Sequence, residues 1–285
     1  MRKTIDEPTE LLDALSTLFP DSSKTTLRQM LQAGRVRVNL EIEKNARREL
    51  AAGDAIEVAT KTTQRALPPE LTLLHEDEHV IVVLKANGLL TVPTERERET
   101  TAQAYLNTYL GARGEERIHV VHRLDRETSG VLVFAKHFAA REALKEQFAE
   151  HSTDRLYVAI IEGKLDEPNG TIASHLREMR DLKMVSVKPH PEAKYAVTHY
   201  KTVKTARGYS MLEVTLETGR KNQIRAHLSE AGHPIIGDVM YGSTVNPIGR
   251  LGLHAKRLGF THPKTAKRLV FEAPVPNAFT RLMGG

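Results

Sequence analysis

The sequence predicts an α+β protein in two parts, a small N-terminal α/β module and a large domain with a mixed, largely antiparallel central sheet, flanking helices and loops. After residue 70, strand patterns outnumber helical patterns and do not alternate with them regularly, as is typical of α+β domains. Residues 60–70, TKTTQRALPPE, are polar and end in two prolines and a glutamate, which indicates a linker. We therefore expect domains at 1–60 and 71–285, joined by a linker at 61–70.

The N-terminal module is predicted to begin with two short helices. The leucines of residues 11–18 recur at helical spacing, so one face of this segment is apolar. A second helix is indicated by Leu27, Met30 and Leu31. Ser22 or Ser23 is placed to cap it, because a serine hydroxyl can accept a hydrogen bond from an amide of the first turn.

A small sheet is predicted to follow these helices. In RVRVNLEIE, residues 35–43, apolar and polar side chains alternate, which predicts one continuous strand. Its buried face would carry Val36, Val38, Leu40 and Ile42. Gly53 and Asp54 then indicate a turn before a strand at 55–58.

The large domain is predicted to be rich in strands. Apolar runs indicate buried strands at 80–85, 131–135 and 156–161. At 211–217 the pattern alternates, so the inner face of that strand should carry Leu212, Val214 and Leu216. Two helices are expected, at 139–150 and at 221–232, the second ending at Gly232.

Composition excludes several kinds of chemistry. The 285-residue chain has no cysteine, so it can form no disulfide, thiolate nucleophile or cysteine-bound metal cluster. Its hydrophobic content of 40% is sufficient for a substantial core, while its apolar runs are too short to cross a bilayer. We expect a soluble, cytoplasmic, monomeric protein that makes no membrane contact.

A modest basic excess favours an anionic partner. The formal net charge is +5, and residues 24–48 alone carry seven bases against two acids, an excess equal to that of the whole chain. An ordinary solvated surface would explain such a run, but its position on a compact module favours phosphate binding. The candidate contacts are Lys24, Arg28, Arg35, Arg37, Lys44 and Arg47.

The segment HRLDRETSG, residues 122–130, sets a dense group of charges directly before a buried strand. A charged turn would account for it, with Asp125 capping its own backbone and Gly130 in an unusual conformation. The density of charge favours a functional site instead, and the neighbouring bases are expected to keep Asp125 ionised well below neutral pH. A carboxylate withdrawn from water needs a cationic partner, since breaking a buried pair costs about 3–5 kcal/mol.

A second basic cluster, TGRKNQIRAHL at 218–228, can supply that partner. Its bases are Arg220, Lys221 and Arg225. Ile224 and Leu228 form an apolar pair four residues apart, which places Arg225 one residue round from the buried stripe. An arginine at such a position is ordinarily a snorkelling surface residue, and pairing with Asp125 is the alternative.

Several motifs resemble, in the same order, those of the RluA-type pseudouridine synthases, which isomerise uridines in RNA. They are HRLDRETSG with VLVFAK after it, RLYVAIIEG, TGRKNQIRAHL, IIGDVMYG and LHAKRLGFTHP. The resemblance spans residues 71 to about 275 and implies the pseudouridine synthase fold. Residues 10–60, through AGRVRVN and GDAIEV, resemble the S-four-like RNA-binding module that often precedes this family's domain. The chain departs from the family's usual residues at Arg155, at Lys221 and Asn222, and in KANG at 85–88. These differences concern contacts with RNA more than the reaction.

The resemblance implies roles for individual residues. Asp125 would be the catalytic nucleophile or its electrostatic equivalent; attack on the sugar, addition to the uracil ring and assistance of a glycal route all stay open. Tyr157, alone an ordinary core aromatic, would stack on the base and help remove the ring proton, and Arg225 would pair with Asp125. Arg123 would enter the space left by the flipped base. Further substrate contacts are expected from His122, Leu124, Arg126, Arg220, Gln223 and Leu228.

The resemblance also implies RNA as the partner, ribosomal rather than transfer RNA, and chemistry that requires no metal, cofactor or cosubstrate. Two other functions stay open: a non-catalytic RNA-binding or ribosome-assembly factor on the same scaffold, and a sugar-cleaving hydrolase, which usually needs two carboxylates. No metal site is expected at His75 and His79, which we interpret as solvated loop histidines, because their segment precedes a strand rather than lying on a long helix.

Overall fold

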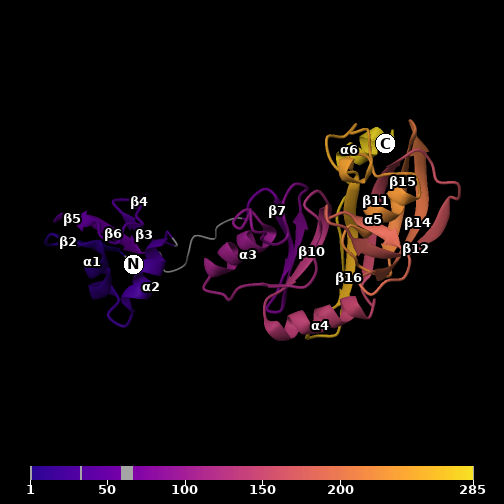
Figure 1. Ribbon diagram of the computed structural model, residues 1–285. Coiled ribbons are helices and arrows are strands. Elements are labelled where there is room, and N and C mark those ends of the chain that lie inside the picture. Colours follow the sequence, from indigo (N-terminus) through magenta and orange to yellow (C-terminus); the bar gives the residue numbers. More distant parts are fainter. Residues whose placement is uncertain (1, 33, 59–66, 285) are drawn as a thin grey trace. The chain divides into compact units, whose positions relative to one another are not determined.

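The computed structural model describes residues 2–32, 34–58 and 67–284, coloured along the sequence in Figure 1. Two compact units divide the chain, one of Met1–Ala66 with Asn107–Glu116 and the other of Leu67–Leu106 with Arg117–Gly285. The part of the predicted linker at 61–66 lies outside the described residues. No helix within the described ranges is long and apolar enough to cross a membrane.

The first unit buries one apolar core between helices and strands. Its helices are α1 (Leu11–Leu18) and α2 (Lys24–Gln32), and Ser23 caps α2 by accepting a hydrogen bond from Thr26 N–H at 3.2 Å. The antiparallel sheet has the order β1-β6-β3-β4. Its strands are β1 (Arg2–Thr4), β6 (Ala55–Val58), β3 (Val36–Val38) and β4 (Glu41–Ile42), and a separate pair joins β2 (Thr9–Glu10) to β5 (Glu49–Leu50). The leucines of both helices and the valines of β3 fill the core.

The prediction of one continuous strand at 35–43 is wrong. Asn39 and Leu40 have φ angles of 51° and 73°, which makes them the two central residues of a tight hairpin turn. The Asn39 side chain holds this turn, because its amide accepts from Ala55 N at 2.9 Å and donates to Asp54 Oδ1 at 2.8 Å. The turn pairs Val38 with Glu41, so Ile42 moves to the opposite face, and both Leu40 and Ile42 are exposed.

The second unit is built on one 11-stranded sheet that is mixed and largely antiparallel, as predicted. The order is β13-β12-β14-β15-β11-β16-β10-β8-β7, with β17 paired to β16 and β9 paired to β10. Strands β10 and β16 run parallel, and the other described pairs are antiparallel. The bounds are β7 (Leu71–Glu76), β8 (Val80–Lys85), β9 (His119–Val120), β10 (Ser129–Ala135), β11 (Asp154–Glu162), β12 (Asn169–Glu178), β13 (Met184–Val187), β14 (Lys194–Ala206), β15 (Tyr209–Leu216), β16 (Leu253–Thr261) and β17 (Arg268–Glu272).

Short helices flank this sheet (Figure 1). They are α3 (Ala102–Gly111), α4 (Phe138–Ala149), α5 (Gln223–Glu230), α6 (Asn277–Leu282) and the 3-10 turn η1 (Val239–Tyr241). Helices α4 and α5 agree with the predictions at 139–150 and 221–232, except that α5 begins at Gln223, because Asn222 before it is left-handed with φ 48°. Leu144 of α4 lies in the core cluster of β10, and Ile224 of α5 lies in that of β15.

The sheet order explains how distant segments meet. Strands β15, β11, β16 and β10 are consecutive neighbours. The loop before β10 carries the segment 122–128, and the turn after β15 leads through 217–222 into α5. Residues about 100 positions apart in the sequence are therefore carried by four adjacent strands, with the loop before β10 level with the start of β16 and the turn after β15 level with the start of β11.

Candidate active site

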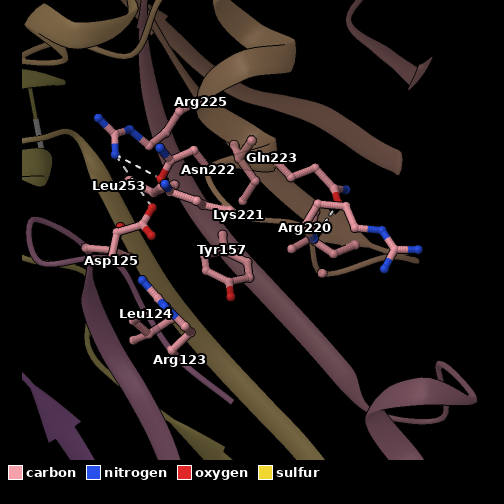
Figure 2. A pocket seen from close by; sticks show the side chains of 14 residues that line it. Arg123, Leu124, Asp125, Tyr157, Arg220, Lys221, Asn222, Gln223, Arg225 and Leu253 are labelled. Carbon is pink, nitrogen blue, oxygen red and sulfur yellow. Dashed lines mark hydrogen bonds and ion pairs between the residues drawn. The ribbon is translucent and has the colours of Figure 1, made fainter. Parts of the chain in front are cut away.

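A cavity of about 170 Å³ opens where these segments meet (Figure 2). Its walls come from the loop before β10, from β11, from the start of β16 and from the turn between β15 and α5. Of the residues expected from the sequence, those that line it are Arg123, Leu124, Asp125, Tyr157, Arg220, Gln223 and Arg225. Folding thus assembles seven of the ten predicted catalytic and substrate-binding residues around one hollow.

Asp125 and Arg225 form an ion pair in this cavity, with 3.6 Å between Oδ2 and Nη1. The Asp125 side chain is 22% exposed. Burial raises the pKa of its carboxyl, and the positive charges of Arg225 and Arg123 offset this effect only in part. The neighbouring bases lower the pKa, as expected, but the effect of burial is larger, so the net shift is upward. A carboxylate with a raised pKa is the more basic, and hence the stronger proton acceptor and nucleophile.

The principal partner of Arg225 is Asp238, a residue that the sequence analysis did not assign. Arg225 donates from Nε to Asp238 Oδ2 at 2.7 Å and from Nη2 to Oδ1 at 2.8 Å. Nη1 donates to Asn222 Oδ1 at 3.2 Å, and the guanidinium lies over the Tyr241 ring at 4.9 Å. These contacts fix the plane of the guanidinium, so that Nη1 is the atom presented to Asp125.

Tyr157 lies on β11 and faces the cavity beside Asp125 (Figure 2). The register between β11 and β16 shifts between Leu156 and Tyr157, a bulge that re-aims the side chain. Burial raises the pKa of Tyr157, with the Asp125 charge adding to the shift and Arg155 opposing it. The phenol is therefore protonated at neutral pH, and its ring offers an apolar face to a flat base.

Arg155, two residues earlier on the same strand, supports the wall of the cavity and was not among the predicted site residues. Its Nη2 donates to the carbonyls of Leu216 at 3.3 Å and Glu217 at 3.0 Å, at the end of β15. A Cβ on Gly219 would lie 2.7 Å from its Nη1, so a larger residue at 219 would displace this guanidinium. The arginine thereby holds the turn that leads to α5.

Two residues expected to bind substrate, His122 and Leu228, are instead engaged within the fold. His122 Nε2 accepts from Val133 N at 3.2 Å and its ring stacks on Phe148 at 4.5 Å, which turns it toward the core. Burial, with the charge of Arg155 in second place, lowers the pKa of His122 to about 3. Leu228 is fully buried in the cluster that includes Leu253, so it packs behind the cavity wall.

Gln223 lines the cavity, but protein groups occupy its polar atoms. Its Oε1 accepts from Thr218 Oγ1 at 2.7 Å and Arg220 N at 3.0 Å. Its Nε2 donates to Val197 O at 2.9 Å and Thr198 Oγ1 at 3.0 Å. Gln223 therefore clamps the start of α5 to β14, and its substrate contact stays a prediction.

The other predicted contacts differ in their surroundings. Leu124 is buried in the cavity wall. Its backbone N–H donates to Thr91 Oγ1, and its carbonyl accepts from the same hydroxyl. Arg126 pairs with Glu97 at 3.2 Å and lines an adjoining cavity. Arg220 donates from Nε to Tyr195 O at 3.0 Å and points away from Asp125 in Figure 2.

The predicted phosphate contacts lie in the first unit. All but one of the six side chains are exposed, the exception being the half-buried Arg35. Lys24 lies 3.5 Å from Asp13, a solvated pair that leaves its charge accessible. Their role in RNA binding stays a prediction.

The interpretation of His75 and His79 as solvated loop histidines is only partly right, because His75 lies on β7, His79 lies between β7 and β8, and both are half-buried. Asp77 Oδ2 accepts from His75 Nε2 at 2.9 Å and from His262 Nε2 at 3.0 Å, and His79 Nδ1 lies 2.8 Å from His137 Nε2. Burial acts to raise the pKa of Asp77, but hydrogen bonds from His75 and from backbone amides prevail and lower it to about 2. The cluster joins β7 to the segment after β16 and to the start of α4. Over the described ranges, no group of three or more acidic or histidine side chains is arranged to hold a metal ion.

Comparison with known proteins identifies the scaffold. The family model for RNA pseudouridylate synthase matches residues 79–230. The ribosomal large subunit pseudouridine synthase D of Neisseria meningitidis serogroup A is 35% identical, over 95% of this chain and 77% of that protein. The chain belongs to the RNA pseudouridylate synthase family.

Other members of this family agree in sequence and in structure. The uncharacterized RNA pseudouridine synthase YlyB of Bacillus subtilis is 32% identical over 98% of this chain and 94% of its own. The solved structure of human RNA Pseudouridylate Synthase Domain Containing 4 has a TM-score of 0.62 and 26% identity, covering 73% of this chain and 90% of that one. The expected pseudouridine synthase fold of the second unit is confirmed.

Proposed function

We propose that this enzyme converts a uridine of structured large-subunit ribosomal RNA to pseudouridine, with Asp125 as the reacting carboxylate. The observation that carries the proposal is the half-buried Asp125 carboxylate, held at 3.6 Å from Arg225 beside Tyr157 in one cavity. Ribosomal RNA is favoured because several relatives at 31–35% identity are named ribosomal large subunit pseudouridine synthase D.

The reaction needs no external reactant. The bond between N1 of uracil and C1′ of ribose breaks, the base turns, and C5 bonds to C1′; the C5 proton leaves to solvent and N1 gains a proton. Asp125 can carry the sugar as an ester between these two bonds, the role of a nucleophile in retaining glycosidases. One Asp125 oxygen faces Arg225, and in Figure 2 the other lies on the side of Tyr157, where a flipped base would stack.

The first unit is proposed to act as an S-four-like RNA-binding domain. Support comes from its two helices on a small antiparallel sheet and from exposed bases on α2, on β3 and after β4. Each phosphate contact should lower the logarithm of affinity by about 0.7–0.9 for each tenfold rise in salt. We also propose that the protein works as a monomer in the cytoplasm.

Two observations count against the other functions considered. A factor that only binds RNA gains nothing from a half-buried carboxylate that repels phosphate. A sugar-cleaving hydrolase usually needs a second carboxyl group as acid, but Asp238, which also contacts Arg225, uses both oxygens to accept hydrogen bonds from that arginine.

The test is conversion of an unmodified transcript of large-subunit ribosomal RNA labelled with tritium at C5 of uridine. Wild-type protein should release tritium, and Asp125→Asn, which keeps the shape of the side chain, should bind the transcript but release none. Pseudouridine mapping of total RNA from cells with and without the gene then locates the site. Identical maps would refute the catalytic proposal, whereas a change confined to transfer RNA would refute only the proposed substrate.

A further inference from the structure

A second cavity, of about 460 Å³, adjoins the first. The two share the residues on which the chemistry depends, Asp125 and Arg225, together with Arg123, Lys221 and Asn222. The second cavity is therefore continuous with the proposed uridine site. Its far wall is formed by η1 and by the tip of the hairpin between β12 and β13.

Three exposed apolar side chains border this second cavity. They are Leu182, 59% exposed, Val239, 81% exposed, and Met240, 45% exposed. Single exposed apolar residues are common on protein surfaces, but a group around one hollow indicates a binding surface. The same cavity is also lined by Arg123, a positively charged and exposed residue.

Both segments that carry these side chains are held rigidly. Asp238, immediately before η1, is bound to Arg225 through both carboxylate oxygens, and its carbonyl accepts from the N–H groups of Tyr241 and Ser243 at 3.0 Å each. The Tyr241 hydroxyl in turn accepts from Met184 N at 2.9 Å and so joins η1 to β13. Val239 is thus projected from a fixed turn into solvent.

The hairpin tip fixes Leu182 in the same way. Leu182 N–H donates to Met179 O at 2.9 Å, and Met179 N–H donates to Lys183 O at 2.8 Å. Leu182 has a φ of 67°, a conformation that glycine and asparagine adopt far more readily than leucine. The chain therefore keeps a large apolar side chain at a position where its backbone conformation is unfavourable.

We propose that Leu182 and Val239 bind the unstacked base of the nucleotide adjacent to the target uridine. The inference rests on the proposed function, because flipping the uridine exposes the faces of its neighbours to water. A flat base fits the apolar rim, and its phosphate meets the positive charge of Arg123, which lines the same cavity. The occupant is a nucleotide of the same RNA strand, since the cavity is continuous with the uridine site.

Three variants test the rim on the tritium-labelled ribosomal transcript. Val239→Ala removes two methylene equivalents of apolar contact, so KM should rise about tenfold while kcat stays within about twofold. Leu182→Asn keeps a residue that tolerates positive φ and should raise KM similarly without loosening the turn. Val270→Ala, a 52% exposed valine on β17, is the matched control and should leave KM unchanged.

A short RNA around the mapped uridine then identifies the occupant. An abasic residue is placed on either side of the target, and each RNA is assayed with wild-type protein and Val239→Ala. The RNA that is abasic on one particular side of the target uridine should bind wild-type protein more weakly. For this RNA, Val239→Ala should cause no further loss of affinity, because the same contact has already been removed. Additive losses on both sides, or an unchanged KM for both rim variants, would overturn the inference. If wild-type protein releases no tritium from any transcript, the proposed function itself has failed.

Discussion

Replacement of Asp238 by asparagine should damage both the fold and the reaction, although Asp238 was not expected to belong to the site. Its side chain is 1% exposed, and both its oxygens accept hydrogen bonds from Arg225. Asparagine keeps the shape but removes the charge and turns an amide N–H toward the guanidinium. Breaking a buried ion pair in this way costs about 3–5 kcal/mol. For a unit of this size, that loss lowers the unfolding midpoint by about 6–20 °C.

Thermal unfolding of the second unit, followed by circular dichroism, measures this loss, and tritium release measures the reaction. We expect kcat to fall as well, because Arg225 would no longer present Nη1 to Asp125. The control is Glu178→Gln, which removes the exposed partner of Lys221 and should change stability by no more than about 1 kcal/mol. A midpoint for Asp238→Asn within about 2 °C of wild type would show that Arg225 does not depend on this pair, and the argument for its orientation would be lost.

Two further predictions concern stability. Burial lowers the pKa of His122 to about 3 and of His254 to about 4. Below pH 6.5 the unfolded state therefore binds more protons than the folded state. The free energy of unfolding should fall by about 2 kcal/mol per histidine between pH 7 and pH 5. Urea unfolding at both pH values measures this fall, and His254→Asn, which keeps an acceptor for Ser129 Oγ, should remove about half of it; an equal fall in the variant would contradict the assignment. Gly130→Ala should be strongly destabilising, because its Cβ would lie 2.3 Å from Ala255 O at a φ of 133°, whereas Gly111→Ala, with open space around it, should be neutral or slightly stabilising in the same assay. A folded Gly130→Ala protein of wild-type stability would mean that β10 and β16 can separate without cost.

The sequence predicted well those helices and strands in which the spacing of apolar residues follows from burial against the core. The runs at 80–85, 131–135 and 156–161 coincide with β8, β10 and β11, because strands covered on both faces are apolar throughout. The hairpin turn at Asn39 and Leu40 was not predicted. A two-residue turn keeps the alternation of apolar and polar residues in the sequence, but it places the apolar residues after the turn on the opposite face of the sheet. The deciding interaction, from Asn39 to Asp54 and Ala55, spans about fifteen positions and has no signature within the segment.

The same limit applied to the site. Motif resemblance selected His122, Gln223 and Leu228 together with Asp125 and Tyr157, but it could not tell residues that support the cavity from those that face it. That distinction depends on contacts such as the stacking of His122 on Phe148, which only the packed sheet creates. One available signal went unused, namely an aspartate at position 238 within the apolar run IIGDVMY. An acid in such a run requires a buried cation, and Arg225 was the candidate.

The division of Arg225 between two carboxylates explains why Asp125 has a raised pKa despite its cationic neighbour. Two close hydrogen bonds, at 2.7 and 2.8 Å, join the guanidinium to Asp238, whereas Asp125 lies 3.6 Å away. A bidentate pair with Asp125 would stabilise the carboxylate strongly and lower its pKa, and would thereby weaken it as a nucleophile. Arg225 holds Asp238 by two hydrogen bonds, and at Asp125 burial has a larger effect on the pKa than the charge of Arg225. Arg225 thus orients the Asp125 carboxylate while leaving it basic, which is what the proposed role of Asp125 as nucleophile requires.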